Sequence, residues 1–64
     1  MTQKELLYME DAINHEQSII SICNDLINNL KDDNLISFIK KEIRKHTTMY
    51  ELLIQTMEDS INEW

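Results

Sequence analysis

Apolar residues recur at intervals of three and four through almost the whole chain, which is the spacing of one face of an α-helix. In the first half, two neighbouring rows step by seven residues: Leu6, Ile13, Ile20, Ile27 and Met9, Glu16, Cys23, Leu30. In the second half, the corresponding rows are Ile36, Ile43, Tyr50, Met57, Trp64 and Ile39, His46, Leu53, Ser60. The pattern predicts two long amphipathic helices and no strand.

Local signals place the ends of these helices. The segment Thr2-Gln3-Lys4-Glu5 has the form of a capping box, and Asp32 or Asp33 is suited to cap a second helix. We expect helix one over about residues 3–30 (closed by a left-handed Asn), a turn over about 31–33, and helix two over about 33–61. A turn this short makes the helices antiparallel neighbours within a single domain, residues 1–64.

Size and composition indicate self-association. The chain has 64 residues without Gly or Pro, and its single cysteine cannot form an internal disulfide. One hairpin has a single seam and cannot enclose a core. A third apolar row, Ala12, Ile19 and Leu26, makes the apolar face wider than that seam requires. We therefore predict an all-α fold in which hairpins associate as a homodimer or tetramer into a four-helix bundle.

Each helix carries one ionisable residue in a core row, Glu16 and His46. If facing residues have numbers that add to about 64, Glu16 lies within one turn of His46, and Glu42 shares a face with His46. The three side chains can therefore converge near the middle of the hairpin. A two-fold axis at that level would gather four carboxylates and two imidazoles, a ligand set suited to two Fe or Mn ions.

Two interpretations of this polar layer stay open. In one, Glu16, Glu42 and His46 bind metal, with His15 and Tyr50 as candidates to orient the ligands. In the other, a buried Glu16–His46 pair only fixes how the helices pair. His15 on its own is typical of an exposed interfacial residue and Tyr50 of packing, while Cys23 is typical of a small buried hydrophobe.

Charge and motifs exclude several classes of function. The net charge of −6 argues against nucleic-acid binding, and the bases at 40–45 suit a solvated face. No apolar run approaches the length of a membrane span or a signal peptide, and a lone thiol fits a reducing, cytoplasmic setting. The sequence contains no Ser-His-Asp order, Gly-rich phosphate loop or Cys-x-x-Cys motif. We expect a protein that is not an enzyme.

Two segments, Tyr8-x-Glu10-Asp11-Ala12-x-Asn14-His15-Glu16 and Phe38-Ile39-Lys40-Lys41-Glu42-x-x-x-His46, resemble the small ferritin-like hairpins of spore-forming bacteria, in particular the spore coat F-like group. The resemblance implies a ferritin-like bundle, a forespore or spore-coat location, and metal ligation by Glu16, Glu42 and His46. Ferritin-like sites use Glu-x-x-His, so the spacing here differs by one residue. If the layer is redox-active, the resemblance implies ferroxidase-like oxidation of Fe(II). The alternative is a helical adaptor or regulator that binds other proteins.

Overall fold

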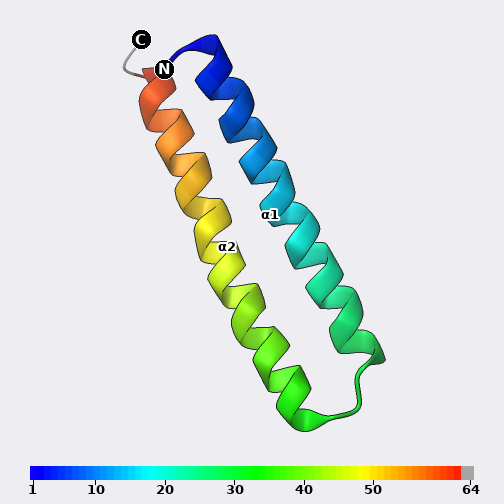
Figure 1. Cartoon of the computed structure of the whole chain (residues 1–64). Helices are drawn as coiled ribbons and strands as arrows, with labels where there is room; N and C mark the ends of the chain where they lie inside the picture. Colours follow the sequence, from blue (N-terminus) through cyan, green and yellow to red (C-terminus); the bar gives the residue numbers. More distant parts are fainter. Residues whose placement is uncertain (63–64) are drawn as a thin grey trace.

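Two antiparallel helices joined by a short turn make up the structure, a computed structural model that describes residues 1–62 (Figure 1). Helix α1 spans Gln3–Asn29 and helix α2 spans Asp33–Asn62. The Cα atoms extend over 49 × 15 × 11 Å, so the molecule is a rod two helices wide. The predicted all-helical hairpin is confirmed, and both helices end within one residue of the expected positions. Trp64, placed in a core row by the sequence pattern, lies outside the described residues.

Helix α1 begins with the predicted capping box. The Thr2 hydroxyl accepts a hydrogen bond from the Glu5 amide at 3.1 Å, and the Glu5 carboxylate accepts one from the Thr2 amide at 2.8 Å. Two backbone amides that the helix itself cannot satisfy thus gain partners. The hydrogen bonds from the Thr2 backbone and side chain lower the pKa of Glu5 below its ordinary value of 4.5.

The turn is closed by Asp32, as one of the two capping alternatives predicted. Its carboxylate accepts hydrogen bonds from the amides of Asn34 at 2.8 Å and Leu35 at 3.0 Å. The expected left-handed Asn is wrong: no described residue has a positive φ, and Leu30 leaves α1 in an extended conformation (φ −95°, ψ 146°). The side-chain amide of Asn29 donates to the Asp25 carbonyl at 2.8 Å, and α1 ends without a left-handed residue.

The two pairs of heptad rows form the contact between the helices, which we call the inner seam. Every described member is buried or half-buried, and Ile13 and Cys23, each 8% exposed, are the most buried. The inner seam consists of Leu6, Met9, Ile13, Glu16, Ile20, Cys23, Ile27 and Leu30 from α1, and Ile36, Ile39, Ile43, His46, Tyr50, Leu53, Met57 and Ser60 from α2. Helical periodicity alone therefore identified the buried face of both helices.

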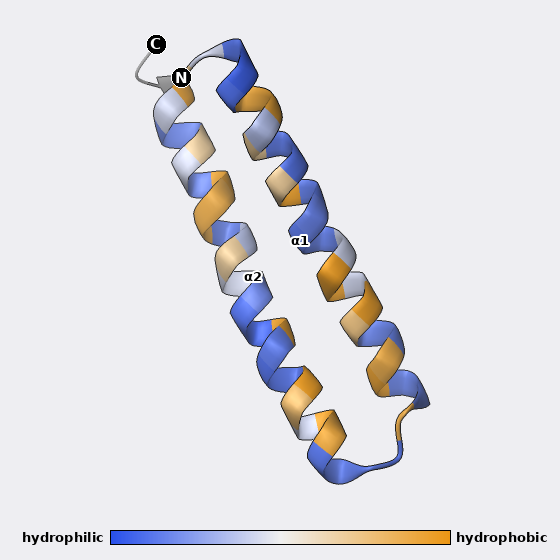
Figure 2. Ribbon diagram, viewed as in Figure 1, coloured by the Kyte–Doolittle hydropathy of each residue, from blue (hydrophilic) through white to orange (hydrophobic). Residues whose placement is uncertain are grey.

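Much apolar surface remains outside the inner seam. Nine large apolar side chains are between 41% and 61% exposed, and both helices show apolar positions along their length (Figure 2). These residues are Leu7, Tyr8, Ile22, Leu26, Leu35, Phe38, Met49, Leu52 and Ile61. Within residues 1–62, neither helix contains a stretch apolar and long enough to cross a membrane.

Candidate functional site

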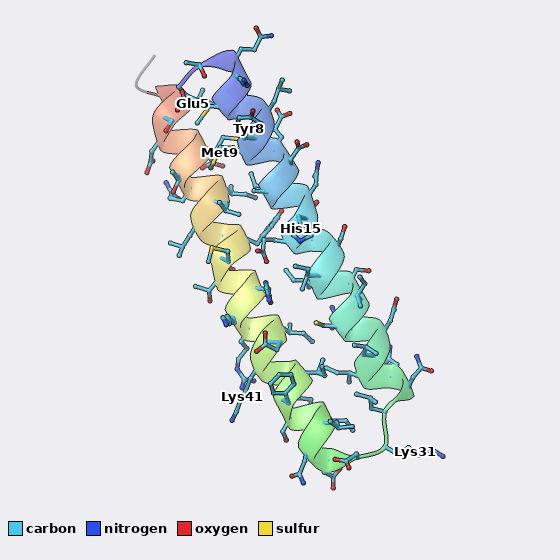
Figure 3. All side chains as sticks on the ribbon, viewed as in Figure 1. Glu5, Tyr8, Met9, His15, Lys31 and Lys41 are labelled. Carbon is cyan, nitrogen blue, oxygen red and sulfur yellow. The ribbon has the colours of Figure 1, made fainter. Side chains whose placement is uncertain are left out.

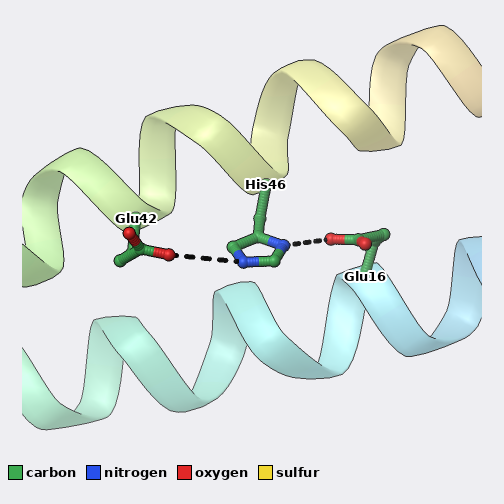
Figure 4. A network of polar contacts seen from close by, with 3 residues as sticks. All are labelled: Glu16, Glu42 and His46. Carbon is green, nitrogen blue, oxygen red and sulfur yellow. Dashed lines mark hydrogen bonds and ion pairs between the residues drawn. The ribbon is translucent and has the colours of Figure 1, made fainter.

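Glu16, Glu42 and His46 meet between the helices, with the imidazole lying between the two carboxylates (Figure 4). Nδ1 of His46 lies 2.5 Å from Oε2 of Glu16, a hydrogen bond that joins α2 to α1. On the opposite edge of the ring, Nε2 lies 3.6 Å from Oε2 of Glu42, which is an ion-pair distance and too long for a hydrogen bond. We call these three side chains the polar layer.

The helical period explains why the polar layer forms. Glu16 and His46 both belong to the inner seam, and the turn sets the pairing depth so that they lie at nearly the same level. Glu42 precedes His46 by one helical turn and shares its face. The side chains of Glu16, His46 and Glu42 are 15%, 24% and 30% exposed. Glu16 is thus the most enclosed of the three and depends most on its partner.

The chemistry of the layer follows from its hydrogen-bond inventory. A carboxylate only accepts, a protonated imidazole donates from both nitrogens, and a neutral imidazole donates from one. Withdrawing Glu16 from water carries a free-energy cost that the His46 hydrogen bond offsets. Among the described residues, no buried side-chain nitrogen or oxygen lacks a partner. The layer therefore inserts polar groups into an apolar seam without leaving a buried one unsatisfied.

Neither His15 nor Tyr50 makes a hydrogen bond or an ion pair with the polar layer. His15 is exposed on α1 (Figure 3). The Tyr50 hydroxyl accepts a hydrogen bond from the side-chain amide of Gln17 at 3.2 Å, so it makes a second polar link between the helices. The sequence pattern predicted a packing role for Tyr50 and did not identify Gln17 as its partner, although Gln17 lies close to the level of Tyr50 in the predicted pairing. Cys23 is buried, as expected of a small hydrophobe.

Taken alone, one hairpin does not present a closed metal site. Within residues 1–62, no three His, Cys, Asp or Glu side chains are arranged to hold a single ion. The reason is geometric: the two carboxylates contact opposite edges of the His46 ring, so one ion at Nε2 would reach Glu42 but not Glu16. Comparison with known protein families, with characterised proteins and with solved structures found no match.

Proposed function

We propose that this protein is a structural or binding protein that works as an oligomeric four-helix bundle, built from two hairpins and aligned by the polar layer. The observation that carries the proposal is the exposure of nine large apolar side chains, set against two buried residues, among those that the structure describes. A soluble chain seldom leaves this much apolar surface open to water. A second pair of helices would cover it.

The energetics of a small domain support association. A hairpin with one seam buries too little apolar area to offset the conformational entropy lost by about 60 ordered residues. Four-helix bundles solve this problem because each helix packs against two neighbours. In this proposal the second contact of each helix comes from another copy of the chain.

The polar layer serves this bundle by specifying how the helices pair. A slip of one heptad would place His46 near Met9 or Cys23 instead of Glu16. Glu16 would then lie in an apolar seam without its hydrogen-bond donor, at a cost of about 1–3 kcal/mol. Buried polar pairs have this use in other helical assemblies, where they set the pairing of helices at some expense of stability.

Sedimentation equilibrium over a wide range of concentrations tests the bundle. The expected mass is a multiple of the 7.7 kDa chain, with two copies as the simplest case. A folded helical protein that keeps a mass of 7.7 kDa throughout would contradict the proposal. That outcome would favour the rival hypothesis, a helical adaptor whose exposed apolar residues await a helix of a different protein.

One observation favours metal binding as a second candidate function. Nε2 of His46 and Oε2 of Glu42 lie 3.6 Å apart, near the roughly 3.4 Å between two ligands bound to one ion at about 2.1 Å. Glu16 on Nδ1 would orient the imidazole from behind, a common arrangement for metal-bound histidines. We propose Fe or Mn as the ion, with a second hairpin supplying the remaining carboxylates. By resemblance alone, the setting would be the forespore or spore coat.

Metal retained per chain after anaerobic addition of Fe(II) or Mn(II) and desalting tests the second function. About one ion per chain is expected for a dinuclear site shared by two hairpins. His46→Ala should abolish retention, and Asp11→Ala should leave it intact because Asp11 is exposed and belongs neither to the inner seam nor to the polar layer. If the unmodified protein retains no ion, the metal hypothesis is wrong and the structural role of the layer is unaffected.

A further inference from the structure

Each helix carries a second row with the alternating spacing of three and four residues, outside the inner seam. We call the two rows together the outer seam. On α1 the row is Tyr8, Ala12, His15, Ile19, Ile22 and Leu26, and on α2 it is Leu35, Phe38, Glu42, Lys45, Met49 and Leu52. Seven of the nine exposed large apolar residues are therefore collected in two lines with coiled-coil spacing. They are Tyr8, Ile22 and Leu26 on α1, and Leu35, Phe38, Met49 and Leu52 on α2.

Both rows of the outer seam lie on the same side of the hairpin. Gln17 on α1 and Thr47 on α2 line one open groove, together with Ser21 and Asn24, so they mark one face. Ile19 and Met49 each follow those residues by two positions, which is about 200° around the helix. The outer seam therefore occupies the face opposite the groove. The outer-seam face carries mainly apolar residues, interrupted near its middle by His15, Glu42 and Lys45.

We propose that the outer seam binds a second copy of this chain, with both turns at the same end, so that α1 packs against α2 of the second copy. This inference rests on the proposed four-helix bundle and specifies its arrangement. The two-fold axis runs parallel to the helices, and the α1 row of each copy faces the α2 row of the other copy. All neighbouring helices are then antiparallel.

Charge favours this arrangement over the one in which α1 packs against α1 of the second copy. Helix α1 holds Lys4 against five acids, a net charge of −4, whereas α2 holds four bases against five acids, a net charge of −1. If α1 packed against α1 of the second copy, two helices that each carry a net charge of −4 would lie side by side and repel each other. Packing α1 on α2 of the second copy instead places a net charge of −4 beside one of −1, so the repulsion is weaker.

Side-chain size agrees with this pairing. The contact between Glu16 and His46 shows that residues lie level when their numbers add to about 62, and a two-fold axis parallel to the helices keeps those levels across the interface. Ala12 then lies near Leu52 of the second copy, a small residue against a large one, and Leu26 lies near Phe38. The polar layers of both copies come to one level, with Glu42, a member of both the layer and the outer seam, between them.

The size of the face suits a stable dimer. It measures 49 by 15 Å between Cα atoms, or about 700 Å² before side chains are counted, near the roughly 800 Å² per partner of a standard interface. Turns at the same end allow overlap along the whole of this length. The face is thus large enough to be covered by one copy of the same hairpin.

A distance between spin labels at the turn tests the arrangement. Lys31 lies in the exposed turn at one end of the rod (Figure 3), and a Lys31→Cys label in a Cys23→Val background gives one label per chain. With helix axes about 10 Å apart, the proposal expects labels within about 30 Å of each other. A distance near the 49 Å length of the molecule would place the turns at opposite ends and overturn the inference while leaving the bundle intact.

A matched pair of substitutions tests the face itself. Leu52 and Leu7 are 58% and 55% exposed, but only Leu52 belongs to the outer seam. Leu52→Asp should raise the dissociation constant of the dimer by at least about tenfold, and Leu7→Asp should raise it by less than about threefold. Equal effects of the two would mean that another surface mediates association. A monomer before any substitution would instead contradict the proposed bundle.

Discussion

Single residues settle where each helix of this hairpin begins. Thr2 and Glu5 satisfy two amides at the start of α1, and Asp32 satisfies two at the start of α2. These contacts are local in sequence, at separations of two or three residues. They therefore form in any chain with the same short segments, before the helices pack.

Replacing Asp32 by Ala removes both capping hydrogen bonds at the turn. We expect a loss of about 1 kcal/mol in the free energy of unfolding, because two amides at the start of α2 lose their acceptor. Denaturant unfolding followed by circular dichroism measures the change. Lys31→Ala, beside it in the turn, should alter the free energy by no more than about 0.5 kcal/mol.

The lowered pKa of Glu5 predicts local opening of α1 in acid. Because this pKa is lower in the folded than in the unfolded chain, the stabilisation is fully present above about pH 4.5 and is lost as the pH falls through the folded value. Amide hydrogen exchange of Thr2 and Glu5, compared at neutral and acidic pH, should show protection that disappears in acid. In a Thr2→Ala variant the same amides should be weakly protected at both pH values.

At the scale of the helices, the proposed role of the polar layer is to reinforce the alignment that the short turn sets between α1 and α2. The apolar members of the inner seam repeat every seven residues and would tolerate a slip of one heptad. The Glu16–His46 hydrogen bond distinguishes one alignment from the others. In this proposal, apolar packing supplies most of the attraction between the helices, and the Glu16–His46 hydrogen bond favours one alignment.

Removing one partner of the layer should be worse than removing both. His46→Leu leaves Glu16 largely enclosed without its donor, and we expect a loss of about 1–3 kcal/mol in the free energy of unfolding. Glu16→Leu combined with His46→Leu should be neutral or stabilising, because two well-packed apolar residues replace the pair. Denaturant unfolding of all four proteins in the cycle gives the coupling energy, and additive losses would contradict the pairing.

At the scale of the whole molecule, the proposed association and the stability of the fold are coupled. The hairpin is a rod two helices wide whose apolar outer seam faces water when the chain is alone. In the proposed dimer, covering that seam contributes stability that a single chain lacks. The stability of the folded chain then depends on the protein concentration.

The melting temperature should therefore rise with protein concentration. For a dimer that unfolds to separated chains, each tenfold increase in concentration adds about 1.4 kcal/mol to the apparent stability, which shifts the midpoint by several degrees. Circular dichroism melts over two decades of concentration measure the shift. Leu7→Asp should preserve it, whereas Leu52→Asp should reduce it; a midpoint independent of concentration would contradict association.

Sequence by itself determined the helices, the capping box at the start of α1 and the buried face of each helix. A period of three and four residues marks one side of any α-helix, and a turn of three residues leaves only an antiparallel neighbour. The short turn also predicted that facing residues have numbers that add to about 64, which brings Glu16, Glu42 and His46 together. In the structure the sum is 62 at the Glu16–His46 contact.

Only the tertiary structure decided what those residues do to one another. Three features could not be predicted from the spacing of residues. They are the edge of the His46 ring that contacts Glu16, the hydrogen bond between Gln17 and Tyr50, and the extended conformation of Leu30 at the end of α1. Each depends on the rotation and axial offset of one helix against the other, to within a fraction of a turn. Periodicity defines a face, but a hydrogen bond requires atoms within about 3 Å, and packing alone sets distances that fine.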